Sequence, residues 1–132
     1  MTIKDFNSMC ALWKEADLDV GHVKTEKEIA DQMIKLNPTS NFVATAGEKI
    51  VGSILGVFNG RRGWVYHLAV HPTFQKKGLG SKLLQKAEQA LKKRGAKRVL
   101  LGVSNSNLKV LPFYKEQGYT EVNDAIWMGK DI

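Results

Sequence analysis

The residues best suited to chemistry in this sequence form a short loop of Gln75, Lys76, Lys77, Gly78, Leu79 and Gly80. Aromatic and β-branched residues precede the loop, so residues 64–70 are predicted to form a strand. Apolar side chains at helical spacing follow it, so residues 79–94 are predicted to form a helix that ends before Gly95. A glycine loop between a strand and a helix directs backbone N–H groups outward at the positive end of the helix dipole. The loop is therefore predicted to bind phosphate, and its two lysines add positive charge.

Spacing alone leaves a simple turn as the alternative interpretation of this loop. The pattern G-x-x-x-x-G-K-[ST] is absent, because Gly80, Ser81 and Lys82 place the serine before the lysine. The pattern G-x-G-x-x-G also fails, since Leu83 stands where its third glycine would be. The residues around the loop have to decide between the two interpretations.

Two ordered motifs around the loop favour phosphate binding over a simple turn. Residues 68–72 read L-A-V-H-P and lead into Q-K-K-G-L-G, and further on Asn107 is followed by Tyr114 and then by Gly118 and Tyr119. This arrangement resembles the GNAT superfamily of acetyl-CoA-dependent N-acetyltransferases, in which a strand ending near V-x-P precedes Q/R-x-x-G-x-G/A at the start of a helix. The resemblance covers residues 64–119, and the N-terminal third of the chain matches only loosely.

The resemblance implies an α/β (α+β) fold in a single domain over residues 1–132, with a mixed, mainly antiparallel sheet of about six strands and four helices. Periodicity predicts a first helix over residues 2–17, and a capping pattern predicts a second helix that has Thr25 as its N-cap and runs to residue 36. A short last helix is predicted after the strand at residues 98–103 and ends at Gln117. Strands are predicted over residues 41–46, 50–58 and 98–103, with a last hairpin through 120–122 and 125–128. The family's first strand is expected to be missing or very short, because the chain starts at Met1, Thr2 and Ile3, which are too few residues for a normal strand. Residues 41–46 are therefore expected at a sheet edge, either covered by the first helix or paired in a homodimer.

Acetyl-CoA is the cofactor that the resemblance implies. The loop would hold its pyrophosphate, the end of the preceding strand would pair with the pantetheine arm, and a free N–H of Leu68 or Val70 would stabilise the reacting oxyanion. Asn107 would bond the pantetheine amides. The residues expected to contact the cofactor are Leu68, Ala69, Val70, Gln75, Lys76, Lys77, Gly78, Leu79, Gly80, Ser81, Asn107 and Tyr114.

Direct transfer of an acetyl group to a primary amine needs an acid for the departing thiolate and a base for the amine. Tyr114 is the expected acid, because a phenol with a pKa near ~10 keeps its proton at neutral pH and can share it with a thiolate. A tyrosine packed in the core is the alternative. His67 lies where many family members have a glutamate, and its near-neutral pKa suits a base. A strand histidine satisfied by a neighbour is the alternative.

The amine acceptor, a small molecule or a peptide, is expected near the end of the first predicted helix. Asp17 and Asp19 would attract its positive charge, and Trp13 would provide an apolar wall. Tyr66, beside His67 on the strand, is also expected to contact it. A solvated acidic loop is the alternative, because exposed charge runs commonly have no partner.

Composition narrows the class of protein further. The chain has 132 residues, of which 43% are hydrophobic and 25% charged, as in ordinary globular proteins. Its single cysteine excludes an internal disulfide and a cysteine-based zinc cluster, and no metal site is predicted. Because no apolar run is long enough for a membrane span and no signal-peptide pattern is present, a cytoplasmic protein without membrane contact is expected.

Charge is distributed unevenly along the chain. Residues 1–71 contain eight Lys/Arg and eight Asp/Glu, so the whole net charge of +7 comes from residues 72–132. A polyanionic cofactor would be attracted to that half, and so would nucleic acid. A basic nucleic-acid-binding module and a CoA-binding sensor without catalysis are therefore the alternatives to an amine acetyltransferase.

Overall fold

The computed structural model describes residues 1–18 and 21–132. The chain divides into two compact units, residues Met1–Gly102 and Val103–Ile132, and each is described by itself. The prediction of a single domain stays a prediction.

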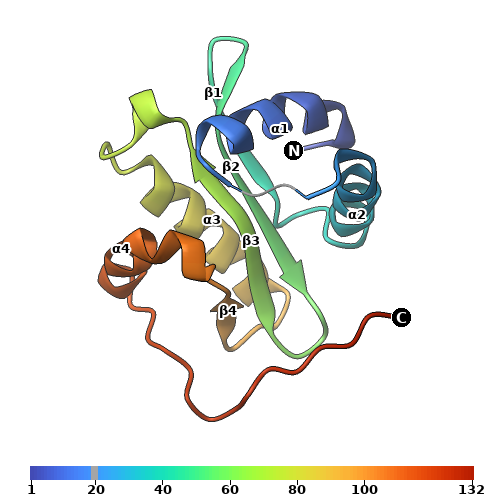
Figure 1. Cartoon of the computed structure of the whole chain (residues 1–132), viewed down its shortest axis with the longest axis vertical. Coiled ribbons are helices and arrows are strands. Elements are labelled where there is room, and N and C mark those ends of the chain that lie inside the picture. Colours follow the sequence, from blue (N-terminus) through green and yellow to red (C-terminus); the bar gives the residue numbers. More distant parts are fainter. Residues whose placement is uncertain (19–20) are drawn as a thin grey trace. The chain divides into compact units, whose positions relative to one another are not determined.

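The first unit is built on a four-stranded sheet in the order β1-β2-β3-β4 (Figure 1). The strands are β1 (Phe42–Ala46), β2 (Lys49–Phe58), β3 (Gly63–Val70) and β4 (Val99–Leu101). The first three strands are antiparallel, and β4 joins β3 in parallel after a helical connection. The sequence-based strand predictions in this unit are confirmed, although β4 is shorter than the predicted 98–103.

Helices cover both faces of this sheet. Ser53 of β2 and Ala69 of β3 are directly paired and face α1 (Phe6–Glu15), which follows the 3₁₀ turn η1 (Ile3–Asp5). Gly52 points the other way, toward α3 (Leu79–Lys93), because successive residues of a strand face opposite sides. Helix α2 (Val23–Leu36) lies on the α1 side, where its Ala30 joins the buried cluster of α1.

The apolar stripe of α1 forms the main core on its side of the sheet. Phe6, Met9, Leu12 and Trp13 are all buried, as the 3.6-residue period requires of one helix face. Helix α2 departs from the prediction, because it begins at Val23 with His22 as its N-cap. Thr25 is therefore an ordinary first-turn residue, and the capping box predicted there is wrong.

Helix α3 ends as the sequence predicts, at a glycine with left-handed backbone. Gly95 has φ +109°, its N–H bonds the Lys92 carbonyl at 3.0 Å, and the next N–H, of Ala96, bonds the Leu91 carbonyl at 3.1 Å. This pair of bonds is the Schellman motif, which satisfies carbonyls left open at a helix end. Arg94 beside it donates to the Asn37 side chain, and its guanidinium carbon lies 5.3 Å from the Phe58 ring centroid, so this cation has a structural role.

The second unit contains η3 (Asn105–Val110) and α4 (Leu111–Glu116) and no strand among its described residues. Helix α4 begins at Leu111, which places Pro112 in the first turn, where its missing N–H costs nothing. The predicted C-terminal hairpin is wrong, and with it the prediction of about six strands. Ile126 and Met128 are 89% and 93% exposed, so the alternating pattern there buries no face. Strand propensity depends on a partner strand and a covered face, and a local pattern supplies neither.

Strand β1 is an edge of the sheet, as predicted. It begins only at Phe42, opposite Ile54, so the later part of β2 has no strand on this side. Side chains replace it there: Asn41 Oδ1 accepts from the Gly56 N–H at 3.0 Å, and Asn37 Oδ1 accepts from the Phe58 N–H at 2.9 Å. Ser40 Oγ donates to the Gly56 carbonyl. These bonds close part of the β2 edge within the chain, and the homodimer stays a prediction.

Close packing of this segment against Gly56 gives a stability prediction. A Cβ atom on Gly56 would lie 2.6 Å from the Ser40 carbonyl oxygen, which is backbone and cannot rotate away. Gly56→Ala should therefore lower the free energy of unfolding by about 1–3 kcal/mol, the usual cost of overpacking, as measured by urea denaturation. Gly102→Ala is the control, because a Cβ there meets no atom within 4 Å. Equal stability of the two variants would show that the backbone around Ser40, before β1, shifts at little cost to make room for the added Cβ atom.

Candidate cofactor and catalytic site

A β-bulge in β3 is the central feature of the candidate site. Ser53 pairs with Ala69, and two residues later Leu55 pairs with Tyr66, so His67 and Leu68 together lie opposite the single residue Ile54. His67 has φ +50°, a left-handed conformation that only a few per cent of non-glycine residues adopt. A bulge leaves one residue out of the ladder and turns the strand. Backbone strain of this kind is concentrated at functional sites, where surrounding contacts maintain it.

Contacts from α1 and β2 hold the bulge in place. Ser53 Oγ donates to the His67 carbonyl at 3.0 Å and accepts from Trp13 Nε1 at 2.8 Å. The Trp13 and His67 rings are stacked, with centroids 4.5 Å apart and 30° between their planes. Trp13 is fully buried, so it supports the bulge from within the core. Its predicted role as an apolar wall of the acceptor site stays a prediction.

The His67 ring is largely enclosed. Its Nδ1 is buried, and within residues 1–18 and 21–132 no hydrogen-bond partner reaches it. Burial lowers the pKa of His67 from its ordinary value, and the negative charge of Glu26 on α2 acts in the opposite direction. The imidazole is therefore neutral at physiological pH.

The end of β3 is tied to α1 and β2 through His71. Its Nδ1 accepts from the Thr73 N–H at 3.2 Å, which caps the 3₁₀ turn η2 (Pro72–Phe74). Its Nε2 lies 2.5 Å from Glu15 Oε2 and 3.2 Å from Lys49 Nζ. Because Nδ1 accepts a bond, the proton of the neutral ring is on Nε2 and points to the Glu15 carboxylate. This contact fixes the direction in which the chain leaves β3 and enters the loop.

The predicted phosphate loop has the backbone that its glycines suggested. Lys76 (φ +60°) and Gly78 (φ +80°) are both left-handed, and Gly78 is the N-cap of α3 without a side-chain cap. Gly80 and Ser81 follow in the first turn of α3, where N–H groups have no acceptor within the helix.

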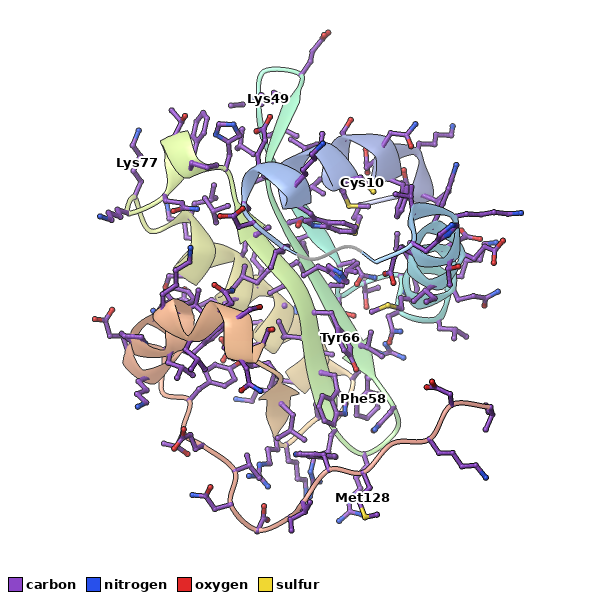
Figure 2. All side chains as sticks on the ribbon, viewed as in Figure 1. Cys10, Lys49, Phe58, Tyr66, Lys77 and Met128 are labelled. Carbon is purple, nitrogen blue, oxygen red and sulfur yellow. The ribbon has the colours of Figure 1, made fainter. Side chains whose placement is uncertain are left out.

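The charged side chains of the loop are turned outward. Figure 2 shows Lys77 directed away from the ribbon at this loop, and its Nζ lies 5.7 Å from the Phe74 ring centroid. Gln75 folds back instead, donating from Nε2 to the Val70 carbonyl at 2.9 Å. The loop thus combines open helix-terminal amides with positive charge, which is the chemistry of an anion site.

Asn107 and Tyr114 lie in the second unit. Asn107 has non-helical backbone within η3, between Ser104 and α4. Tyr114 is held by the end of α4, where the Tyr119 N–H bonds its carbonyl at 3.0 Å and left-handed Gly118 reverses the chain. The Tyr114 and Tyr119 rings meet edge to face at 5.9 Å, the side-chain contact that accompanies a Schellman motif. Burial raises the pKa of Tyr114, so its hydroxyl keeps its proton at neutral pH.

The residues predicted to bind the acceptor are dispersed. Tyr66 is 41% exposed on β3 and stacks on Trp64, while Asp17 follows the C-cap of α1 and has left-handed backbone. Asp19 lies outside the described residues. The acidic group that acts on His67 is Glu26, which sequence reasoning missed because nothing local connects the first turn of α2 with β3. Ser53 was missed for the same reason.

Comparisons with known proteins identify the family of the chain. The model of the acetyltransferase (GNAT) family matches residues 6–119. An acetyltransferase from Pectobacterium atrosepticum is 33% identical over 128 residues, which are 97% of this chain and 89% of that protein. A predicted acetyltransferase from Clostridium acetobutylicum, solved with acetyl-CoA, has a TM-score of 0.77 at 14% identity, covering 98% of this chain and 92% of that one. A Pyrococcus horikoshii protein assigned to the acetyltransferases also has a TM-score of 0.77, at 17% identity, and the match covers 92% of this chain but only 42% of that chain.

Fold, loop and relatives together define an acyltransferase. The chain belongs to the acetyltransferase (GNAT) family, as the resemblance in its two motifs predicted. Among the helices in the described part of the chain, none has the length and apolar character needed to cross a membrane.

The Ser53 hydroxyl provides a test of how the bulge is held. Ser53→Ala leaves the buried Trp13 indole N–H without an acceptor, and it should lower the free energy of unfolding by about 1–3 kcal/mol in urea denaturation. Ser8→Ala on the exposed side of α1 is the control and should stay within about 0.5 kcal/mol of the wild type. An unchanged Ser53→Ala variant would mean that the Trp13 indole finds another acceptor.

Proposed function

We propose that the protein transfers an acetyl group from acetyl-CoA to a primary amine by direct attack within a ternary complex. The observation that carries the proposal is the sequence of bulge, capped turn and glycine loop along one continuous segment from His67 to Gly80. It presents a free strand end and the open amides of a helix N-terminus one after the other, and an extended cofactor with a pyrophosphate needs both. The fold is shared with a Clostridium protein that was solved with acetyl-CoA.

Cofactor binding follows from the groups along this segment. The amides at the start of α3, together with Lys76 and Lys77, would hold the pyrophosphate, while Leu68, Ala69 and Val70 would offer backbone groups to the pantetheine arm. Ser81 would add a hydroxyl at the first turn of α3. Asn107 would bond the pantetheine amides. The net charge of +7, all contributed by residues 72–132, favours a polyanionic ligand.

The chemistry is an exchange of one bond for another at the thioester carbonyl. The neutral amine attacks the carbonyl carbon, a C–N bond forms, and negative charge develops on the carbonyl oxygen. A backbone N–H of Leu68 or Val70, released from regular pairing near the bulge, would stabilise that charge; one such donor is typically worth about 3–4 kcal/mol. The carbonyl then re-forms, the C–S bond breaks, and Tyr114 would protonate the departing thiolate. The attacking nitrogen loses one proton to water, and Tyr114 would regain its own proton from water, so that the amide and the free thiol are the products.

The acceptor is proposed to be a cationic amine that enters on the sheet face covered by α1 and α2. Glu26 is the acidic group whose charge acts on the bulge residue there, so it would attract the ammonium form of the acceptor. Asp17 and Tyr66 remain candidates for contacts farther from the reacting nitrogen.

Cofactor binding is tested with a change at the loop. Acetyl-CoA should raise the melting temperature of the wild type, because it binds only the folded state. Gly80→Asp should abolish this shift, since a carboxylate would occupy the space intended for phosphate oxygens. Gly129→Asp is the control: it also adds a carboxylate at a glycine, where a Cβ meets no atom within 4 Å, and should keep the shift. A Gly80→Asp variant that folds and binds acetyl-CoA with wild-type affinity would contradict the proposed cofactor site.

Removal of the Tyr114 hydroxyl tests whether this residue is the general acid. Tyr114→Phe should lower kcat by about 10–10³-fold, an order of magnitude taken from general-acid catalysis, and should change the affinity for acetyl-CoA much less. Steady-state acetylation of a panel of amines, with thiol release as the readout, measures both. Tyr119→Phe is the matched control, because its ring packs against Tyr114 at the same helix end. Wild-type turnover of Tyr114→Phe, where chemistry limits the rate, would reassign Tyr114 to packing.

A further inference from the structure

The surroundings of the His67 ring differ on its two nitrogen atoms. Nδ1 is buried, and no hydrogen-bond partner reaches it among the described residues. The fully buried Trp13 stacks on the ring, with the two ring centroids 4.5 Å apart. The Ser53 hydroxyl donates to the His67 carbonyl oxygen and not to the ring. His67 as a whole is only partly buried, so its exposed surface lies at atoms other than Nδ1. The ring therefore has one nitrogen, Nδ1, that is both buried and unpartnered among the described residues.

This asymmetry selects one neutral form of the ring. A neutral imidazole carries its proton on one nitrogen and a lone pair on the other. A buried N–H without a partner loses its hydrogen bond to water and costs about 1–3 kcal/mol, and such orphaned donors are rarer than unsatisfied acceptors. The lone pair therefore belongs on Nδ1, and the proton belongs on Nε2.

The same argument disfavours His67 as a general base. To take a proton at Nε2, the ring must first carry its proton on Nδ1, and the product is an imidazolium with protons on both nitrogens. Each of these forms places an N–H at the buried, unpartnered Nδ1. In the Ser-His-Asp arrangement a carboxylate accepts that N–H and stabilises the imidazolium. No carboxylate bonds His67 Nδ1 in the described part of the chain, and Glu26 acts on the ring through its charge alone.

The titration behaviour of the ring agrees with this geometry. Burial lowers the pKa of His67, and the opposing effect of Glu26 does not restore it to its ordinary value. Of the elements packed near the ring, α1 contributes the uncharged Trp13, β2 the uncharged Ser53 and α2 the charged Glu26. The group thus stays neutral through the pH range in which an amine acetyltransferase would operate.

We propose that His67 is held as the Nε2–H tautomer and donates this hydrogen bond to an oxygen atom of the amine acceptor. His67 is then a specificity-determining residue, and the substrate class is an amine with a hydroxyl, carbonyl or carboxylate oxygen close to the reacting nitrogen. The ammonium proton of the acceptor goes to water before attack, so no side chain on β3 has to accept it. This inference rests on the proposed function, because it assigns a role within the same site.

The tautomer is tested without any substrate. Long-range ¹H–¹⁵N NMR spectra of the uniformly labelled protein distinguish a protonated from an unprotonated ring nitrogen, and single substitutions of His22 and His71 assign the three histidines. We expect His67 to show an unprotonated Nδ1 and a protonated Nε2 from pH 6 to pH 8. A protonated Nδ1, or an imidazolium in that range, would overturn the proposal, whatever the activity measurements give.

Substitutions test the role in catalysis. The side-chain amide of His67→Gln carries an N–H near the position of Nε2 but cannot act as a base at neutral pH. His67→Gln should keep kcat/KM within about 10-fold of the wild type for the best acceptor of the amine panel, while His67→Phe, which has no donor, should lose about 10–100-fold, mostly in KM. If His67 is instead the base, both variants should lose activity equally, by the 10²–10⁴-fold typical of such catalysis. Unchanged affinity for acetyl-CoA and an unchanged circular dichroism spectrum establish that each variant is folded.

The acceptor's oxygen is tested with a matched pair of amines, the best acceptor and its analogue without the neighbouring oxygen. Wild type and His67→Gln should prefer the first, and His67→Phe should lose that preference. An equal preference in all three proteins would contradict the hydrogen bond. If no amine of the panel is acetylated, the proposed function fails, and the NMR measurement still decides the tautomer.

Discussion

The Ser53 hydroxyl group is the contact on which the candidate site depends. It accepts from the indole of Trp13 on α1 and donates to the carbonyl of His67 on β3, so one side chain of β2 joins the core to the bulge. A non-glycine residue with φ +50° costs about 1–2 kcal/mol relative to ordinary backbone. The stacking of Trp13 on the His67 ring and the Ser53 bond offset that cost and keep the residue in one orientation. The backbone groups of the following residues, Leu68 to Val70, take their direction from this point.

Beyond the bulge, a capped turn and two helix ends determine the path of the chain between the candidate site residues. His71 caps the turn after β3 and is tied to Glu15 at the end of α1, so the loop begins from a defined position. Gly78 then starts α3, and Gly118 ends α4 with the Tyr114 ring against Tyr119. Each of them satisfies backbone groups that a helix end leaves open. The candidate site residues at these positions are therefore held by the same bonds that stabilise the helix ends.

Burial has opposite consequences for the two proposed reactive side chains. It raises the pKa of Tyr114 and lowers that of His67, and in both cases the cause is the cost of placing a charge away from water. Both groups are therefore neutral near pH 7, one as a phenol with its proton and the other as an imidazole with a single N–H. In the proposed reaction such a site would donate hydrogen bonds and transfer a proton to the leaving group, and the acceptor would lose its ammonium proton to water before it attacks.

The sequence by itself determined the features that depend on neighbours along the chain. Residues 64–80 predicted the strand, the glycine loop and the following helix, and Gly95 predicted the end of α3. These features are local, because turn residues, helix caps and apolar periodicity act within one or two turns. The motif resemblance identified the family for the same reason, since its two patterns are short segments of consecutive residues.

Only the tertiary structure decided the features that depend on residues far apart in the sequence. The bulge at His67 needs Ser53 and Trp13, which are 14 and 54 positions away in the sequence. No local pattern at residues 66–68 predicts it. The edge of β2 is closed by Asn37 and Asn41 and not by a longer β1, and the alternating residues of the C-terminal segment find no partner strand. Strand pairing and side-chain burial are set by what the fold brings alongside, because their free energy comes from contacts between elements and not from propensity within one.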